Sequence, residues 1–429
     1  MPAVTHLRDK LVRSTLFRQA LGTYGTQLTV AAIGVVVSAI VTRILGPEGR
    51  GKYSVAMAVG MIGVQLGHLG LHATNSYFVA RDRSVLPSLV ANALISSFVI
   101  GGCAATLAGA VFWLWPRLAP IYGWLLVLSL AWIPVNLAYL LTVNLLMGLR
   151  QVAAYNRMEL LNRILPILLV FCVIAVRMVS PESVLLAMLL GMFLAFLVAL
   201  ARLWRFLETR VSPSLQLFQQ SFAMGWKAYL ATLFAFLVIR IDLLLVRYIL
   251  GTEQAGFYSI AGAMADYVLL LPSAVGAILF PRLAAMQNDT DKLNLTTRAS
   301  WGIGAALLLL LGVLGIFVRP IVRLVFGKAF LPAASAILLL MPGVFSLGLE
   351  VVLVQYLNSL GFPVRVVVLW AVTTALNVVL NLWAIPAFGI AGASVVSSLS
   401  YFLALVGVVW IIQAERRQRG MALPDQGGA

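Results

Sequence analysis

Long apolar runs recur along the whole chain and are separated by short polar links. Most of them reach the ~20 residues that a helix needs to cross a hydrocarbon core of roughly 30 Å. Lipid offers the backbone no hydrogen bonds, so such runs predict helices that bond within themselves. The alternation over about ten residues that marks a lipid-facing β-barrel strand is absent from the sequence. We predict an all-α polytopic membrane protein with twelve spans, at 20–42, 53–79, 88–113, 121–147, 160–179, 183–204, 226–250, 254–280, 299–318, 333–358, 364–385 and 389–412.

Composition supports this prediction. A chain that is 62% hydrophobic and 10% charged, with a mean hydropathy of +1.01, is not a soluble protein. The net charge of +16 raises the question of nucleic acid, but the Lys and Arg residues are dispersed between the spans. That distribution is typical of topology signals and of contacts with lipid headgroups. We predict no nucleic-acid partner and no cofactor.

The basic residues sort by side of the membrane. With twelve spans, twenty Lys and Arg fall on the side of the N-terminus and nine on the other side. Because positive charge favours the cytoplasmic side, both termini are predicted to be cytoplasmic. Residues 1–19 are predicted to form a basic amphipathic segment at the membrane surface, and 413–429 a cytoplasmic tail.

One stretch occurs twice. The sequence ILGPEGRGKYSVA at 44–56 returns as ILGTEQAGFYSIA at 249–261, with eight of thirteen positions identical and a constant offset of 205. A match at about half the chain length indicates duplication. We predict six-helix halves at 20–204 and 226–412, joined by a cytoplasmic linker at 205–225. An even number of spans separates the copies, which predicts two parallel repeats around a central cavity.

Four motifs, in order, resemble a known family. They are LGPEGRGKY after the first span, FPR at 280–282, LVFGKAF at 324–330, and Asn377-x3-Asn381 followed by IPAFGIAGA at 385–393. Together they resemble the polysaccharide-export branch of the MOP flippase superfamily, which includes the Wzx-type O-antigen flippases. The resemblance covers nearly the whole chain. The resemblance rests on the order and positions of the four motifs together.

The resemblance implies a function. It implies alternating-access transport of an undecaprenyl-diphosphate-linked oligosaccharide from the inner to the outer leaflet of a bacterial plasma membrane, for O-antigen, capsule or exopolysaccharide synthesis. The implied partners are this substrate, membrane lipids, and the polymerase and chain-length proteins of polysaccharide assembly. Drug-exporting MATE antiporters of the same superfamily also have twelve spans, but the Gly-Pro-Glu-Gly link fits the polysaccharide branch better.

Charged residues at membrane depth are the first candidates for the site, because each costs about 2.5–3.5 kcal/mol to insert. Arg240, Asp242 and Arg247 lie in the seventh predicted span, Asp266 in the eighth and Glu350 in the tenth. Arg240 and Arg247 share a helix face, and Asp242 points about 200° away from Arg240. Arg240 either binds phosphate or pairs with Asp266 or Asp242. The three acids either form ion pairs or couple transport to protons or sodium.

Polar stripes on other spans are further candidates. They could hydrogen-bond sugars in a wet cavity, or hold packed helices together. The stripes are Gln65, His68, His72 and Asn75 in the second span, Asn136, Tyr139 and Asn144 in the fourth, and Trp370, Thr373, Asn377 and Asn381 in the eleventh. His68 and His72 have the i, i+4 spacing of metal ligands but lack a third ligand nearby, so no metal site is predicted.

Three other functions compete with a flippase. A MATE-like drug or cation antiporter shares the predicted span count. A membrane enzyme of polysaccharide assembly needs a catalytic carboxylate or base in a sizeable aqueous loop, and the largest outer link, around 319–332, has three cations and no acid. A scaffold of the assembly complex has no need of charge inside the membrane. We therefore expect a transporter and not an enzyme.

Overall fold

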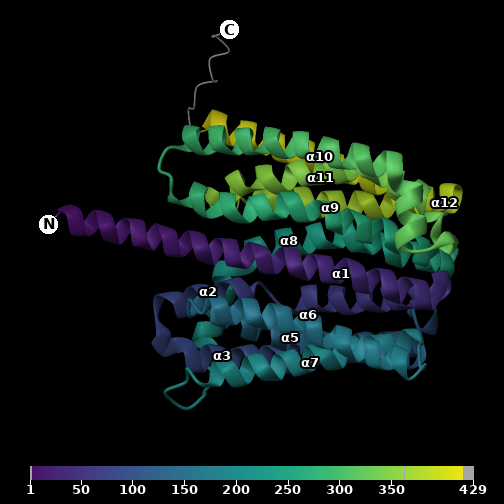
Figure 1. The fold of residues 1–429 in the computed structure, drawn as a ribbon, viewed down its shortest axis with the longest axis horizontal. Helices are drawn as coiled ribbons and strands as arrows, with labels where there is room; N and C mark the ends of the chain where they lie inside the picture. Colours follow the sequence, from purple (N-terminus) through teal and green to yellow (C-terminus); the bar gives the residue numbers. More distant parts are fainter. Residues whose placement is uncertain (1, 362, 419–429) are drawn as a thin grey trace, which may run out of the picture. The chain divides into compact units, whose positions relative to one another are not determined.

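The structure is a computed structural model that describes residues 2–361 and 363–418, with side chains described from residue 33. Within these ranges all regular structure is helical. The side chains of the predicted surface segment 1–19, and the end of the predicted tail, 419–429, lie outside the described residues. The helices (Figure 1) are α1 (Pro2–Gly67), α2 (Leu71–Arg81), η1 (Arg83–Val85), α3 (Leu86–Ile95), η2 (Ser96–Ile100), α4 (Gly101–Leu114), η3 (Pro116–Leu118), α5 (Gly123–Gly148), α6 (Val152–Ala175), α7 (Pro181–Trp204), α8 (Leu215–Leu250), α9 (Thr252–Ala285), α10 (Asp289–Val325), η4 (Lys328–Phe330), α11 (Ala333–Ser359) and α12 (Val364–Gln418).

The helices confirm an all-α multi-pass membrane protein. Among the described residues, nine helices are long and apolar enough to cross a membrane, or ten if the bent pair Ile33–Gly67 and Leu71–Arg81 forms one span. The 55 residues of α12 contain a break at Gly389. At about 1.5 Å per residue, that helix is more than twice as long as a hydrocarbon core is thick. The count of twelve spans therefore stays a prediction.

The two copies of the repeated sequence share a backbone conformation. Gly46, inside α1, has φ 65° and ψ −178°, and Gly251, just before α9, has φ 92° and ψ −179°. This region of φ/ψ space is essentially restricted to glycine. Each glycine marks the point where one helical run ends and the next begins, so the sequence repeat is also a structural repeat at this position.

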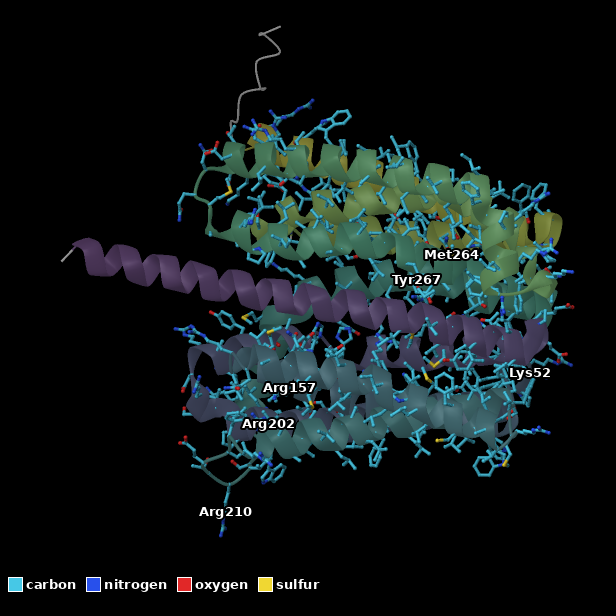
Figure 2. The ribbon with its side chains drawn as sticks, viewed as in Figure 1. Lys52, Arg157, Arg202, Arg210, Met264 and Tyr267 are labelled. Carbon is cyan, nitrogen blue, oxygen red and sulfur yellow. The ribbon has the colours of Figure 1, made fainter. Side chains whose placement is uncertain are left out.

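The chain forms two compact units, Met1–Trp226 and Lys227–Ala429. In the first unit α5 lies against α1, α2, α4 and α7. Figure 2 places Lys52 at one end of this unit and Arg157, Arg202 and Arg210 at the other. Lys52 falls on the predicted outer side of the membrane and these three arginines on the predicted cytoplasmic side.

In the second unit α11 lies against α9, α10 and α12. Close approach of α11 and α12 depends on Gly343, because a Cβ there would lie 2.4 Å from the Cα of Ser398. The Ser398 hydroxyl accepts the Gly343 N–H at 3.2 Å and donates to the Leu339 carbonyl at 2.7 Å. These contacts fix the register of the helices that carry the polar residues described below.

The segment 205–225 differs from the prediction in where its helix begins. Residues 205–214 are not helical, but α8 begins at Leu215 and continues without a break into the seventh predicted span. Ser214 accounts for this start, because its hydroxyl accepts the Leu217 N–H at 3.3 Å, as an N-cap does. The Asn92 side chain also bonds both the N–H and the carbonyl of Ser214, at 3.0 and 2.8 Å.

Candidate functional site

Arg240 of α8 forms an ion pair with Asp266 of α9. Its Nη2 lies 2.8 Å from Asp266 Oδ2, so of the two acids considered from sequence the partner is Asp266. The side chains are 26% and 40% exposed, respectively, so neither charge is fully buried. The guanidinium also lies 5.9 Å from the Phe236 ring centroid, where a cation–π contact orients it. Figure 2 shows Met264 and Tyr267, which flank Asp266, partway along α9.

The Arg240 guanidinium keeps most of its hydrogen-bonding capacity. An arginine has five N–H donors. In the described part of the chain Arg240 makes one hydrogen bond, to Asp266, and its Nε is buried without a partner. A planar fork with unused donors and partial exposure is suited to the bidentate binding of a phosphate. Binding of a phosphate by Arg240 stays a prediction.

Asp242 occupies a different environment, two residues along the same helix. It is 1% exposed, and its carboxylate accepts hydrogen bonds from Tyr258 Oη at 3.1 Å, from Asn381 Nδ2 at 3.0 Å and from Ser397 Oγ. These donors come from α9 and α12. No cation pairs with Asp242 among the described residues. The predicted separation of Asp242 from Arg240 agrees with this arrangement.

The two asparagines of the Asn377-x3-Asn381 motif extend this polar cluster. Asn381 Nδ2 also reaches Asn377 Oδ1 at 3.2 Å, and Asn377 Nδ2 donates to Ser400 Oγ at 3.2 Å. Both asparagines are fully buried, and Asn381 Oδ1 has no hydrogen-bond partner. The stripe that includes Trp370 and Thr373 is likewise a buried face. The Asn381 amide connects α12 to α8 through Asp242. A role of the two asparagines in binding substrate stays a prediction.

Glu350 and Arg247 are the remaining charged candidates. Glu350 of α11 is 3% exposed and makes no hydrogen bond or ion pair with any described residue. Arg247 of α8 is half-buried, and its Nε lacks a partner. An isolated buried carboxylate is expensive unless it is protonated or binds a cation. Glu350 is therefore a candidate for ion coupling, as the sequence suggested.

The polar stripe of the second span is not continuous, which corrects a prediction. Residues 68–70 interrupt the helix, with Leu69 at φ 48° and Gly70 at φ 76°, and the axes on either side differ by 47°. His68 Nδ1 accepts the Gly70 N–H at 3.0 Å, so this side chain caps the break. The i, i+3, i+7, i+10 spacing therefore does not place Gln65, His68, His72 and Asn75 along one straight helix face.

The two histidines nevertheless remain together. Their rings are perpendicular, with centroids 4.8 Å apart. His72 Nδ1 is buried without a hydrogen bond, and Asn75 is buried in α2. The described residues contain no group of three or more His, Cys, Asp or Glu side chains able to hold a metal.

Residues 40–335 match the family described as "Polysaccharide biosynthesis protein". The chain belongs to this family. The matched region includes the first repeat copy at 44–56, the second at 249–261, and the Arg240–Asp266 pair. This membership agrees with the resemblance to polysaccharide-export proteins that the four sequence motifs indicated.

Two curated relatives of this family member come from the archaeon Haloferax volcanii. "Probable flippase AglR" is 28% identical over 173 residues, which cover 38% of this chain and 35% of the relative. "Probable low-salt glycan biosynthesis flippase Agl15" is 23% identical over 227 residues, covering 51% and 47%. The chain thus spans between about a third and a half of the length of the curated relatives it matches.

Solved structures share the fold of the family member. An inward-facing multidrug resistance MATE transporter of the MOP superfamily superposes with a TM-score of 0.75, at 14% identity, covering 94% of this chain and 100% of that one. The lipid II flippase MurJ in an inward closed conformation superposes with a TM-score of 0.66, at 12% identity, covering 89% and 87%. At these identities the likeness establishes the fold alone.

Sequence reasoning missed several residues of these clusters. Tyr258 stands in the second repeat copy and was interpreted there as part of a turn, and Ser397 was not singled out. Glu159 of α6 was also missed, because the fifth span was predicted to begin one residue later. Its Oε1 accepts a hydrogen bond from Tyr139 Oη at 3.1 Å. These residues could have been found by looking for polar side chains on neighbouring predicted helices, and not only for stripes along a single helix.

Proposed function

We propose that this protein is a flippase that moves a polyprenyl-diphosphate-linked oligosaccharide, with undecaprenyl as the expected carrier, from the inner to the outer leaflet of a bacterial plasma membrane. The glycan would serve cell-surface polysaccharide synthesis, as O-antigen, capsule or exopolysaccharide. The family membership and the names of the two archaeal relatives support glycan transport as the general role. Polymerase and chain-length proteins are the proposed partners, and both termini are proposed to be cytoplasmic.

The proposal rests on the environment of the Arg240 guanidinium. It is a permanent positive charge at membrane depth, it is partly exposed, and it uses one hydrogen bond of a possible five. A diphosphate is the one group common to every substrate of the proposed class. Arg240 is thus proposed to bind this diphosphate, with Arg247 forming a second position about 10 Å along the same helix face.

Ion coupling is proposed to use the acids that face no cation. Asp242 is surrounded by neutral oxygen and nitrogen groups, and Glu350 has no polar partner in the described chain. Either carboxylate could take up a proton or a small cation such as sodium. The polar stripes around Gln65, His72 and Asn75 are proposed to contact the sugars.

The proposal is tested by two substitutions at Arg240. Arg240→Lys keeps the charge but loses the bidentate geometry, so transport should be partial. Arg240→Gln should abolish transport of the lipid-linked oligosaccharide while the amount of folded protein in the membrane stays near normal. The double variant Arg240→Gln with Asp266→Asn removes both charges of the pair, and transport should remain absent. Recovery of transport in this double variant would reject the phosphate-binding role.

A MATE-like antiporter is the second candidate, because the first structural neighbour described above is a multidrug transporter. It predicts export of cationic dyes by the purified protein. A positive charge at Arg240 disfavours a cationic substrate near that position, so we rank this function below a flippase.

A further inference from the structure

Asp266 is the only group that bonds the Arg240 guanidinium in the described chain, and it does so through a single contact. The 2.8 Å contact joins one Nη2 to one Oδ2, and the rest of the fork is unused. A carboxylate committed to holding a buried arginine usually binds it bidentately and out of contact with solvent. Asp266 is the more exposed member of the pair, at 40%. Its carboxylate therefore has room to leave the guanidinium.

The other nearby acid cannot exchange in this way. Asp242 is buried, and Tyr258, Ser397 and Asn381 occupy its carboxylate oxygens. It also lies on the far side of α8 from Arg240. Asp242 is thus fixed by neutral donors, whereas Asp266 is held by a single, partly exposed ion pair.

A diphosphate and Asp266 compete for the one positive charge of Arg240. The diphosphate carries roughly two negative charges and is repelled by a carboxylate a few ångströms away, at an energy that rises as the site loses water. If both anions stayed at Arg240, the single guanidinium charge could not neutralise both of them. Binding of one therefore requires the other to withdraw.

We propose that Asp266 is an exchangeable counterion: it neutralises Arg240 in the empty carrier, yields it to the diphosphate of the substrate, and displaces the diphosphate when the substrate leaves. This inference rests on the proposed function, in which Arg240 binds phosphate. It explains why an arginine suited to tight phosphate binding does not trap its ligand. A carrier must release its substrate in every cycle, so a competing anion within the site accelerates turnover at the expense of affinity.

Binding to the full-length protein in detergent tests the exchange. The probe is farnesyl diphosphate, with farnesol as the arm that lacks phosphate. Asp266→Asn should bind farnesyl diphosphate about fivefold more tightly than wild type, the scale of a partly exposed ion pair. Asp266→Glu keeps the competing charge and should bind like wild type. Glu253→Gln, which removes an exposed acid at the start of the same helix, is the matched control and should change nothing.

A kinetic readout separates exchange from a purely structural role. In vesicles, Asp266→Asn should lower both KM and kcat for the lipid-linked substrate, because tighter binding slows release. Asp266→Ser removes the charge with a smaller side chain and is measured beside it, so that the result does not depend on one variant folding. Both charge-free variants should keep farnesol binding unchanged.

The outcomes distinguish this inference from the proposed function. If Arg240→Gln loses farnesyl diphosphate binding but both charge-free variants at position 266 bind no tighter than wild type, the counterion role is rejected and the phosphate site stands. If Arg240→Gln binds the probe as wild type does, the proposed phosphate site itself is rejected. Tighter binding with reduced kcat in the charge-free variants, and wild-type behaviour in Asp266→Glu, supports the exchange.

Discussion

Arg240 and Asp242 lie two residues apart on α8 and have opposite surroundings. Arg240 meets an exposed carboxylate and keeps unused donors, whereas Asp242 is enclosed by neutral hydrogen-bond donors. Helix geometry explains the contrast, because positions i and i+2 point about 200° apart. One face of α8 therefore presents a charge that can meet a ligand, and the other contributes a carboxylate to the packed interior of the second unit.

The Asp242 cluster gives a stability prediction. Asn381→Leu removes the donor to Asp242 and leaves a buried carboxylate with one bond fewer, so unfolding in detergent should become easier by about 1–3 kcal/mol. Thermal unfolding of the purified protein measures this. Leu382→Ala, at the neighbouring position whose side chain is 55% exposed, is the control and should shift the midpoint far less. Equal midpoints for Asn381→Leu and wild type would mean that this hydrogen bond does not stabilise the fold.

At the scale of elements, the links between helices depend on glycine conformation. Gly46 and Gly251 share a positive φ and an extended ψ, a combination that other residues adopt only with strain. The duplicated sequence preserves glycine at both positions although five of its thirteen positions differ. The backbone requirement of the turn gives a physical reason for that identity.

Substitution of these glycines is expected to destabilise the links. Gly251→Ala should lower the free energy of unfolding by about 1–3 kcal/mol and reduce the amount of folded protein in the membrane. Gly262→Ala, eleven residues further along the chain in α9, is the control, since a Cβ there meets nothing within 4 Å and its φ is not positive. Alanine favours a helix at such a position by about 1 kcal/mol. A Gly251→Ala protein as stable as the control would contradict the strain argument.

Sequence periodicity predicted the helical fold and the glycine links, because each depends on residues close together in the chain. The charged residues within the predicted spans also limited the candidate ion-pair partners of Arg240 to Asp242 and Asp266. It could not choose Asp266, since that choice depends on how α8 and α9 pack. The break at His68 escaped prediction for a related reason: an apolar run with polar positions at helical spacing does not reveal that a side chain caps its own backbone. Asp242, Tyr258 and Ser397 come together only through three packed helices.

At the scale of the whole molecule, the distribution of charge predicts orientation. Lys52 lies at the opposite end of the first unit from Arg157, Arg202 and Arg210 (Figure 2). Because arginines and lysines accumulate on the cytoplasmic side, the end with the three arginines is expected to face the cytoplasm.

Reporter fusions test this orientation and the span count together. Reporters placed after Gln413 and within 211–222 should both read cytoplasmic, and one placed near Gly327 should read periplasmic. The reason is that six spans are predicted before the linker and six after it, whereas nine spans, an odd number, are predicted before Gly327. A periplasmic reading after Gln413 would contradict the even number of spans and weaken the inference of two equivalent halves.

Transport by the purified protein in sealed vesicles is the measurement that tests the central claim most directly. We predict that the protein moves a defined polyprenyl-diphosphate-linked oligosaccharide between leaflets and does not accumulate a cationic dye. A potential negative on the side of entry should accelerate this movement, because it contributes about 2.3 kcal/mol per charge per 100 mV to a diphosphate. Movement should be lost in Arg240→Gln. Transport of the dye with no movement of the lipid-linked oligosaccharide would contradict the account.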